Sequence, residues 1–107
     1  MSSQIGVFEL LVLMAVSSAG REAYGVPIRQ AVEAGRGREV SGGAVHTTLE
    51  RLTRRGFVTS RVGEATSSRG GRPRRYYRLT RAGELAVRHN YGAVRHLASR
   101  MAPRLTR

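Results

Sequence analysis

The chain has 107 residues, the length of one small domain, and its 19 basic residues outnumber 7 acidic ones for a net charge of +12. Such an excess predicts an anionic partner, with nucleic acid as the first candidate and a membrane surface as the second. The absence of cysteine excludes disulfides, cysteine nucleophiles and zinc fingers, and fits a reducing cytoplasm. The longest apolar run, Leu10–Val16, is too short to span a bilayer, so we expect a cytoplasmic protein without membrane association.

Two helices are predicted first along the chain. The segment from Gln4 to about Ser17 is apolar on nearly all sides, which is typical of a helix packed between other elements. A second helix is predicted from about Tyr24 to Ala34, with Pro27 in its first turn, where proline is tolerated. Gly35 and Gly37 are expected to end it.

The third helix has the clearest signals. Ser41 is a favourable N-cap, and Gly56 is a good stop. Between them Val45, Leu49 and Leu52 follow at i, i+4 and i+7, which predicts one buried stripe.

The opposite face of this third helix is a candidate DNA-contacting surface. It offers hydroxyls and guanidiniums, and its amino end carries small residues that allow close approach to a major groove. The predicted contacts are Ser41, Gly43, Ala44, His46, Thr47, Arg51 and Arg54, with Arg51 at the centre. The alternative is an ordinary solvated basic face.

Two short β-strands joined by a long loop are predicted next, at Phe57–Val62 and Arg75–Leu79. Of the adjacent Tyr76 and Tyr77, one should face the core and the other away. Five arginines fall between positions 69 and 78, which predicts phosphate contacts or insertion into a narrow minor groove. The predicted wing contacts are Arg69, Arg72, Arg74 and Arg75, and Gly71–Arg74 is similar to the core of an AT-hook. A flexible solvated loop is the alternative.

A helical pattern returns from Thr80 and is expected to end at Pro103. Its apolar residues are spaced 4, 3, 4 and 3 apart, as in a coiled-coil seam. They are Val87, Tyr91, Val94, Ala98 and Met101. The order of elements predicts a mainly α fold with a small β-hairpin: a winged helix-turn-helix over residues 1–79 and a C-terminal dimerisation helix over residues 80–107.

Catalytic and metal chemistry are not indicated by the sequence. His89 and His96 are seven apart on one helical face, but no cysteine or aspartate completes a ligand set. No nucleophile–base pair, paired carboxylates or phosphate-binding glycine loop is recognisable. We therefore expect no enzyme activity, no cofactor and no metal.

Four segments together resemble the PadR family of bacterial transcriptional regulators: Phe8–Met14, Ala23–Val26, Val40–Leu52 and Gly70–Gly83. The resemblance implies a winged helix-turn-helix dimer in which the C-terminal helix packs on the partner's N-terminal helix. It thereby adds Phe8 and Leu11 to the predicted dimer seam. It also implies repression of transcription and, in some members, release of DNA when a small molecule binds. One departure is His46, where the family usually has a tyrosine that contacts the DNA backbone.

The favoured interpretation is a homodimeric repressor that binds a palindromic operator in double-stranded DNA. One alternative is a basic RNA-binding protein, although such modules usually display aromatic platforms and this chain has six aromatic residues. A purely architectural DNA-binding protein is the other. The operator, the regulated genes and any small-molecule effector stay open.

Overall fold

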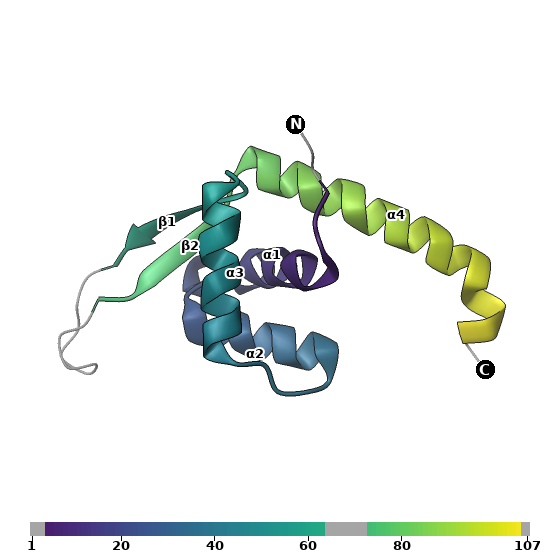
Figure 1. The fold of residues 1–107 in the computed structure, drawn as a ribbon, viewed down its shortest axis with the longest axis horizontal. Coiled ribbons are helices and arrows are strands. Elements are labelled where there is room, and N and C mark those ends of the chain that lie inside the picture. Colours follow the sequence, from purple (N-terminus) through teal and green to yellow (C-terminus); the bar gives the residue numbers. More distant parts are fainter. Residues whose placement is uncertain (1–3, 64–72, 106–107) are drawn as a thin grey trace.

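The structure is a computed structural model, and it describes residues 4–63 and 73–105. Four α-helices, one short 3₁₀ turn and a two-stranded hairpin follow one another along the chain (Figure 1). They are α1 (Val7–Ala19), η1 (Gly20–Glu22), α2 (Gly25–Arg36), α3 (Gly42–Arg54), β1 (Val58–Val62), β2 (Arg75–Leu79) and α4 (Arg81–Leu105). The predicted mainly α fold with a small hairpin is confirmed.

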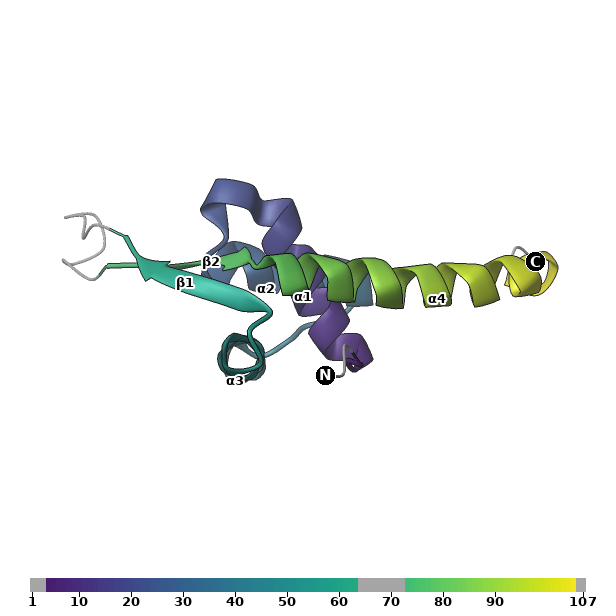
Figure 2. The same ribbon diagram turned by 90° about the horizontal axis from the view of Figure 1, so that it is seen from above.

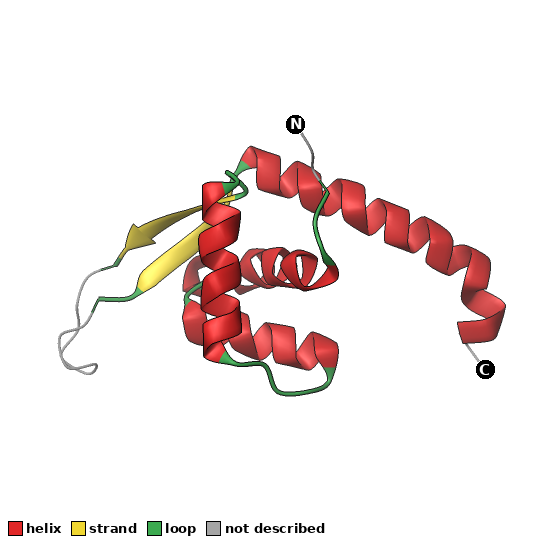
Figure 3. Ribbon diagram, viewed as in Figure 1, coloured by secondary structure: helices red, strands yellow, loops and turns green. Residues whose placement is uncertain are grey.

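One core lies between the first three helices and the hairpin (Figure 3). The predicted stripe of α3 is fully buried, together with Ile28 and Val32 of α2. These side chains meet Leu13 and its neighbours on α1. Burial of such apolar surface is the main stabilising contribution to a domain of this size.

The first helix begins and ends later than the sequence pattern predicts. Its N-cap is Gly6, whose N–H donates to Glu9 Oε1 at 2.9 Å, so residues 4 and 5 precede the helix. At the other end the helix includes both serines, because Ser18 Oγ donates to the Ala15 carbonyl at 3.1 Å instead of disrupting the turn. Gly20, with φ 58°, ends α1.

The predicted ends of the next two helices agree with the structure within a few residues. Ser41 is the N-cap of α3, and its Oγ accepts from the Ala44 N–H at 3.0 Å. Gly37 closes α2 in the left-handed conformation that glycine adopts without strain, while Gly35 lies inside the helix. Tyr24 is the N-cap of α2 rather than its first residue.

The hairpin pairs β1 and β2 antiparallel, with Val58 opposite Leu79 and Val62 opposite Arg75. Tyr77 faces the core, and its N–H donates to the Ala23 carbonyl at 2.8 Å, which ties β2 to the segment before α2. Burial raises the pKa of the Tyr77 hydroxyl above its ordinary value, against the opposing charge of nearby Arg75. Tyr76 lies on the other face, so the predicted in-and-out pair is confirmed.

A tight junction joins the hairpin to α4. Thr80 Oγ1 donates to the Gly56 carbonyl at 2.6 Å and accepts from the Gly83 N–H at 3.0 Å. A Cβ on Gly83 would lie 2.0 Å from the Phe57 carbonyl oxygen, so only glycine fits there. Beyond this junction α4 crosses α1 and extends well past the rest of the molecule (Figures 1 and 2).

The prediction that Pro103 ends the last helix is wrong, because α4 continues to Leu105. A proline within a helix removes one backbone hydrogen bond and disturbs the preceding turn. Only two helical residues follow Pro103, so the helix loses little by carrying it in the last turn.

Candidate nucleic-acid interface

The exposed side of α3 contains the residues that the sequence predicts for DNA contact. Ser41, His46, Thr47 and Arg54 are all exposed, as are Gly43 and Ala44 at the amino end. The buried side includes Thr48 besides the three predicted apolar residues. The structure therefore leaves the amino-terminal half of α3 open to a large ligand.

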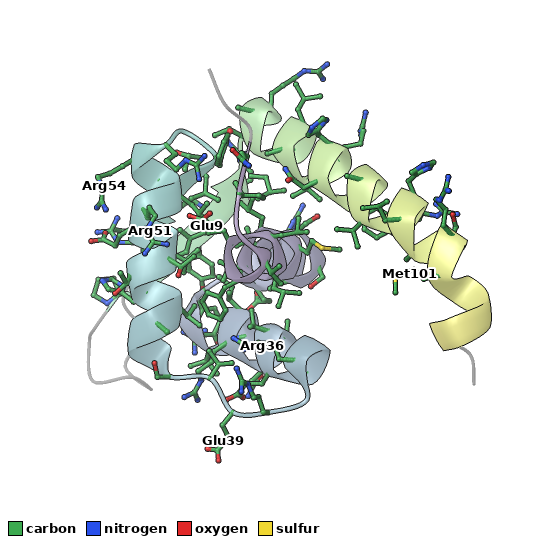
Figure 4. All side chains as sticks on the ribbon, turned by 45° about the vertical axis from the view of Figure 1, so that its right-hand side comes forward. Glu9, Arg36, Glu39, Arg51, Arg54 and Met101 are labelled. Atoms are coloured by element: carbon green, nitrogen blue, oxygen red, sulfur yellow. The ribbon has the colours of Figure 1, made fainter. Side chains whose placement is uncertain are left out.

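Arg51 is not a freely projecting side chain. Its Nη1 lies 3.4 Å from Glu9 Oε2 (Figure 4). Arg55 Nη1 lies 3.4 Å from Glu9 Oε1, so one carboxylate of α1 holds two arginines of the α3 segment. The Glu9 side chain is 13% exposed and that of Arg51 is 46% exposed. Arg55 is held further by the Gln4 carbonyl at 2.7 Å and by the Phe57 ring, 4.8 Å from its guanidinium carbon.

A cavity of about 520 Å³ lies between α2, α3 and β2. Arg29, His46, Arg74 and Arg75 line it, and none of the carboxylates within residues 4–63 and 73–105 does. The cavity also contains Gly25 and Gly42, the first residues of α2 and α3, and a helix amino terminus carries a partial positive charge. The cavity is thus suited to an anion such as a backbone phosphate.

The base of the wing is fixed to the start of α2 by stacked side chains. The Arg74 guanidinium carbon lies 4.0 Å from the Tyr24 ring centroid, and that of Arg61 lies 4.7 Å from the Tyr76 ring. The two tyrosine rings meet edge to face at 5.6 Å. Arg61 is exposed and Arg74 is half-buried, so each of these cation–π contacts is worth about 0.5–1 kcal/mol.

Arg75 of β2 is fixed by the neighbouring strand, since its Nη1 donates to Ser60 Oγ of β1 at 3.1 Å. Arg74 and Arg75 therefore have defined positions at the cavity. The other two predicted wing residues, Arg69 and Arg72, lie outside the described residues, as does Gly71, so half of the AT-hook-like segment is not described.

A family model described as "Transcriptional regulator PadR-like family" matches residues 12–89. The chain belongs to this family. No curated protein matches the sequence significantly. Among solved structures, a PadR-like transcription factor from Bacteroides fragilis is 26% identical with a TM-score of 0.72, and the alignment covers 91% of this chain and 88% of that one.

Two further PadR-family crystal structures share the fold. The regulator from Clostridium difficile R20291 is 22% identical with a TM-score of 0.71 over 94% of this chain and 99% of its own. The regulator from Eggerthella lenta is 24% identical with a TM-score of 0.68 over 89% and 80%. The four helices and the antiparallel hairpin of this chain are thus a PadR winged-helix fold.

The predicted dimer-seam residues of this PadR-like regulator fall into two groups. Phe8, Leu11 and Val87 are partly buried against the core of their own chain, and Arg36 stacks over the Phe8 ring at 5.5 Å. The remaining four lie on the projecting half of α4. Ala98 is half-buried there, and the other three are exposed: Tyr91, Val94 and Met101.

Sequence reasoning missed two residues that this PadR-like structure brings to attention. Leu97 is 61% exposed and widens the apolar stripe of α4, but it does not fit the alternating 4-and-3 spacing. Arg29 lines the cationic cavity, and the spacing of apolar residues in α2 does not predict that it lies beside α3 and the wing. Its position five residues into α2, on the turn that follows the N-cap, is the signal that could have found it.

No group of three potential metal-ligating side chains occurs within residues 4–63 and 73–105. His46 lies near one carboxylate, with its Nε2 3.9 Å from Glu50 Oε1. In the same described part of this PadR-like chain, no helix has the length and hydropathy needed to cross a bilayer.

Proposed function

We propose that this PadR-like protein is a homodimeric transcriptional repressor that binds a palindromic operator in double-stranded DNA. The observation that carries the proposal is the cavity in which, among the described residues, α2, α3 and the base of the wing gather three arginines and a histidine and no carboxylate. It adjoins the exposed amino-terminal half of α3, so a groove contact and a phosphate contact can form side by side.

In this proposal the amino end of α3 enters the major groove, where Gly43 and Ala44 permit close approach. One backbone phosphate occupies the cavity, held by Arg29, His46 and Arg74. Histidine replaces the family's usual tyrosine here, and its ring N–H can donate to the phosphate in the same way.

To contact a base, Arg51 gives up its ion pair with Glu9 and forms hydrogen bonds to the base instead. An ion pair at this degree of exposure stabilises the free protein by about 1 kcal/mol or less, whereas a bidentate contact to guanine is worth about 1–3 kcal/mol. Glu9 keeps its second partner, Arg55, so the carboxylate is not left buried and unpaired when Arg51 turns to DNA.

The dimer is proposed to form through the apolar stripe of α4, with Phe8 and Leu11 on α1 of the partner. A stripe in which Tyr91, Val94 and Met101 are about half exposed costs solubility unless a second copy covers it. Two-fold symmetry of the protein then requires two-fold symmetry of the operator. Residues 1–79 would read DNA and residues 80–107 would join the two copies.

DNase footprinting on the DNA upstream of the gene tests this proposal directly. We expect one protected site with two inverted half-sites, and increased transcription from the adjacent promoter when the gene is deleted. An architectural protein would protect no discrete site, and an RNA-binding protein would be displaced by RNA more readily than by duplex DNA. Decreased transcription in the deletion strain would show an activator instead.

The role of Arg51 is tested with Arg51→Ala. Loss of a base contact should weaken specific binding by about 1–3 kcal/mol and relax the preference at one position of each half-site, with little effect on random duplex. Binding to both duplexes is measured by fluorescence anisotropy. Arg55→Ala is the matched control, because Arg55 shares Glu9 but is tied to the protein by two further contacts. Equal losses on specific and random DNA would make Arg51 a phosphate contact.

A further inference from the structure

α4 has a second surface on the side that points away from the protein. Gly83, Ala86 and Val87 face the core, and the same side of the helix continues as the exposed stripe that includes Val94 and Met101. Because the helix repeats every 3.6 residues, residues on the opposite side point away from the body along its whole length. Figure 4 shows side-chain nitrogens along the outer edge of α4, whereas Met101 points towards the body.

This outward side is basic. Arg81, Arg88 and Arg95 recur every seven residues, so they lie nearly in one line, about 10.5 Å apart at a rise of 1.5 Å per residue. All three are exposed, and none forms an ion pair with the described residues. Glu84 lies one turn from both Arg81 and Arg88 and is the last acidic residue of the sequence, so the row combines three guanidinium groups with one carboxylate and remains positively charged. A second exposed row beside it consists of His89, His96 and Arg100.

We propose that the row of Arg81, Arg88 and Arg95 binds the phosphate backbone of a second DNA duplex, so that a dimer bound at one site bridges two segments of DNA. The row is about 21 Å long, which matches about six base pairs at 3.4 Å each. Guanidinium groups suit phosphate because they can donate two parallel hydrogen bonds. The inference rests on the proposed function, since the first duplex occupies α3 and the cavity.

The two DNA-binding surfaces lie on different sides of the molecule. α4 begins beside the carboxyl end of α3, whereas the cationic cavity lies at the amino ends of α2 and α3 (Figure 1). The row faces away from the body, and a duplex held at the cavity leaves it free. Bridging therefore needs no rearrangement of the chain.

An anionic membrane is the other polyanionic surface that a basic helix could meet. Interfacial helices insert an apolar face while their cations contact the headgroups. On α4 most of the large apolar residues that the structure describes face the body or the proposed dimer seam, and Leu85 and the seam residue Tyr91 are the ones that adjoin the row. Two separate residues form no continuous apolar face that could insert beside the row, so DNA is the better partner.

Duplex capture tests the proposal with the full-length protein. A biotinylated duplex is immobilised, saturated with protein and washed, and a fluorescent duplex of unrelated sequence is then added. Wild type should retain the second duplex. Arg88→Gln combined with Arg95→Gln should lower retention about ten-fold or more and leave affinity for the first duplex unchanged, because each lost phosphate contact removes counterion release. Glutamine is a good helix former, so α4 should persist, and circular dichroism checks this.

The matched control is Arg21→Gln combined with Arg38→Gln, which lowers the net charge equally at exposed positions outside α4. It should capture the second duplex like wild type. Equal loss in both double variants, or full capture by the α4 variant, would overturn the bridging proposal while operator binding still stands. Failure of wild type to bind the first duplex would overturn the proposed function itself. Arginine-dependent sedimentation with phosphatidylserine vesicles, without duplex capture, would assign the row to membranes.

Discussion

At the scale of single residues, two glycines of the same helix have opposite roles. Gly83 faces the Phe57 carbonyl with no room for a Cβ, whereas Gly92 has open space around it. Gly92 also lies on the side of α4 away from the apolar stripe, so a methyl group there meets neither the core nor the proposed seam. The first glycine is required by packing, and the second only weakens the helix.

We therefore expect Gly83→Ala to destabilise the protein by about 1–3 kcal/mol through overpacking. Gly92→Ala should stabilise it by about 0.5–1 kcal/mol through helix propensity. Urea denaturation followed by circular dichroism measures both. Both variants replace glycine by alanine in the same helix, so they differ only in what surrounds the added methyl group. Equal changes in the free energy of unfolding would show that the backbone at Phe57 can move aside at little cost.

The sequence does not predict the side-chain contacts between different elements of the candidate site. Periodicity predicts correctly that Thr47, Arg51 and Arg54 lie opposite the buried stripe of α3. It carries no information about Glu9, 42 positions before Arg51, because that pairing depends on how α1 and α3 cross. The stacking of Arg74 on Tyr24 was missed for the same reason.

At the scale of elements, α4 is divided into a packed half and a projecting half. Its first turns contact α1 and the hairpin junction, and residues 91–97 are all exposed. Hydrophobic spacing predicted the helix and its stripe but not this division. Both halves have the same pattern, and only the three-dimensional course of α1 decides where α4 leaves the body.

The projecting half provides a direct test of the seam. Val94→Glu should convert the dimer to monomer at micromolar concentration, because it buries like charges against each other without a partner. Leu85→Glu is the control, since Leu85 is similarly exposed but lies on the opposite side of α4. Light scattering gives the mass of each variant. If the Val94→Glu variant were still a dimer, or the Leu85→Glu variant a monomer, the dimer interface would not lie along the apolar stripe of α4.

At the scale of the whole molecule, the excess of 12 positive charges governs how binding responds to salt. Six to ten phosphate contacts per dimer would give a slope of about −5 to −9 in a plot of log affinity against log salt. Anisotropy titrations from low to physiological salt measure it. A slope near zero would rule out phosphate-dominated binding.

The junction at Gly83 also decides how far apart two half-sites can be. The close approach to Phe57 and the Thr80 bonds to Gly56 and Gly83 join the wing, α3 and α4 into one stiff piece. In the proposed dimer, each α3 helix would be joined rigidly to its α4 helix. The way the two α4 helices pair would then fix the distance between the two α3 helices. If the two α4 helices paired seven residues further along, each α3 helix would shift by about 10.5 Å, which is nearly a third of a DNA turn. If the proposed dimer forms through this seam, the spacing of the operator half-sites would be set by side chains between Tyr91 and Met101, far from the proposed base contacts of α3.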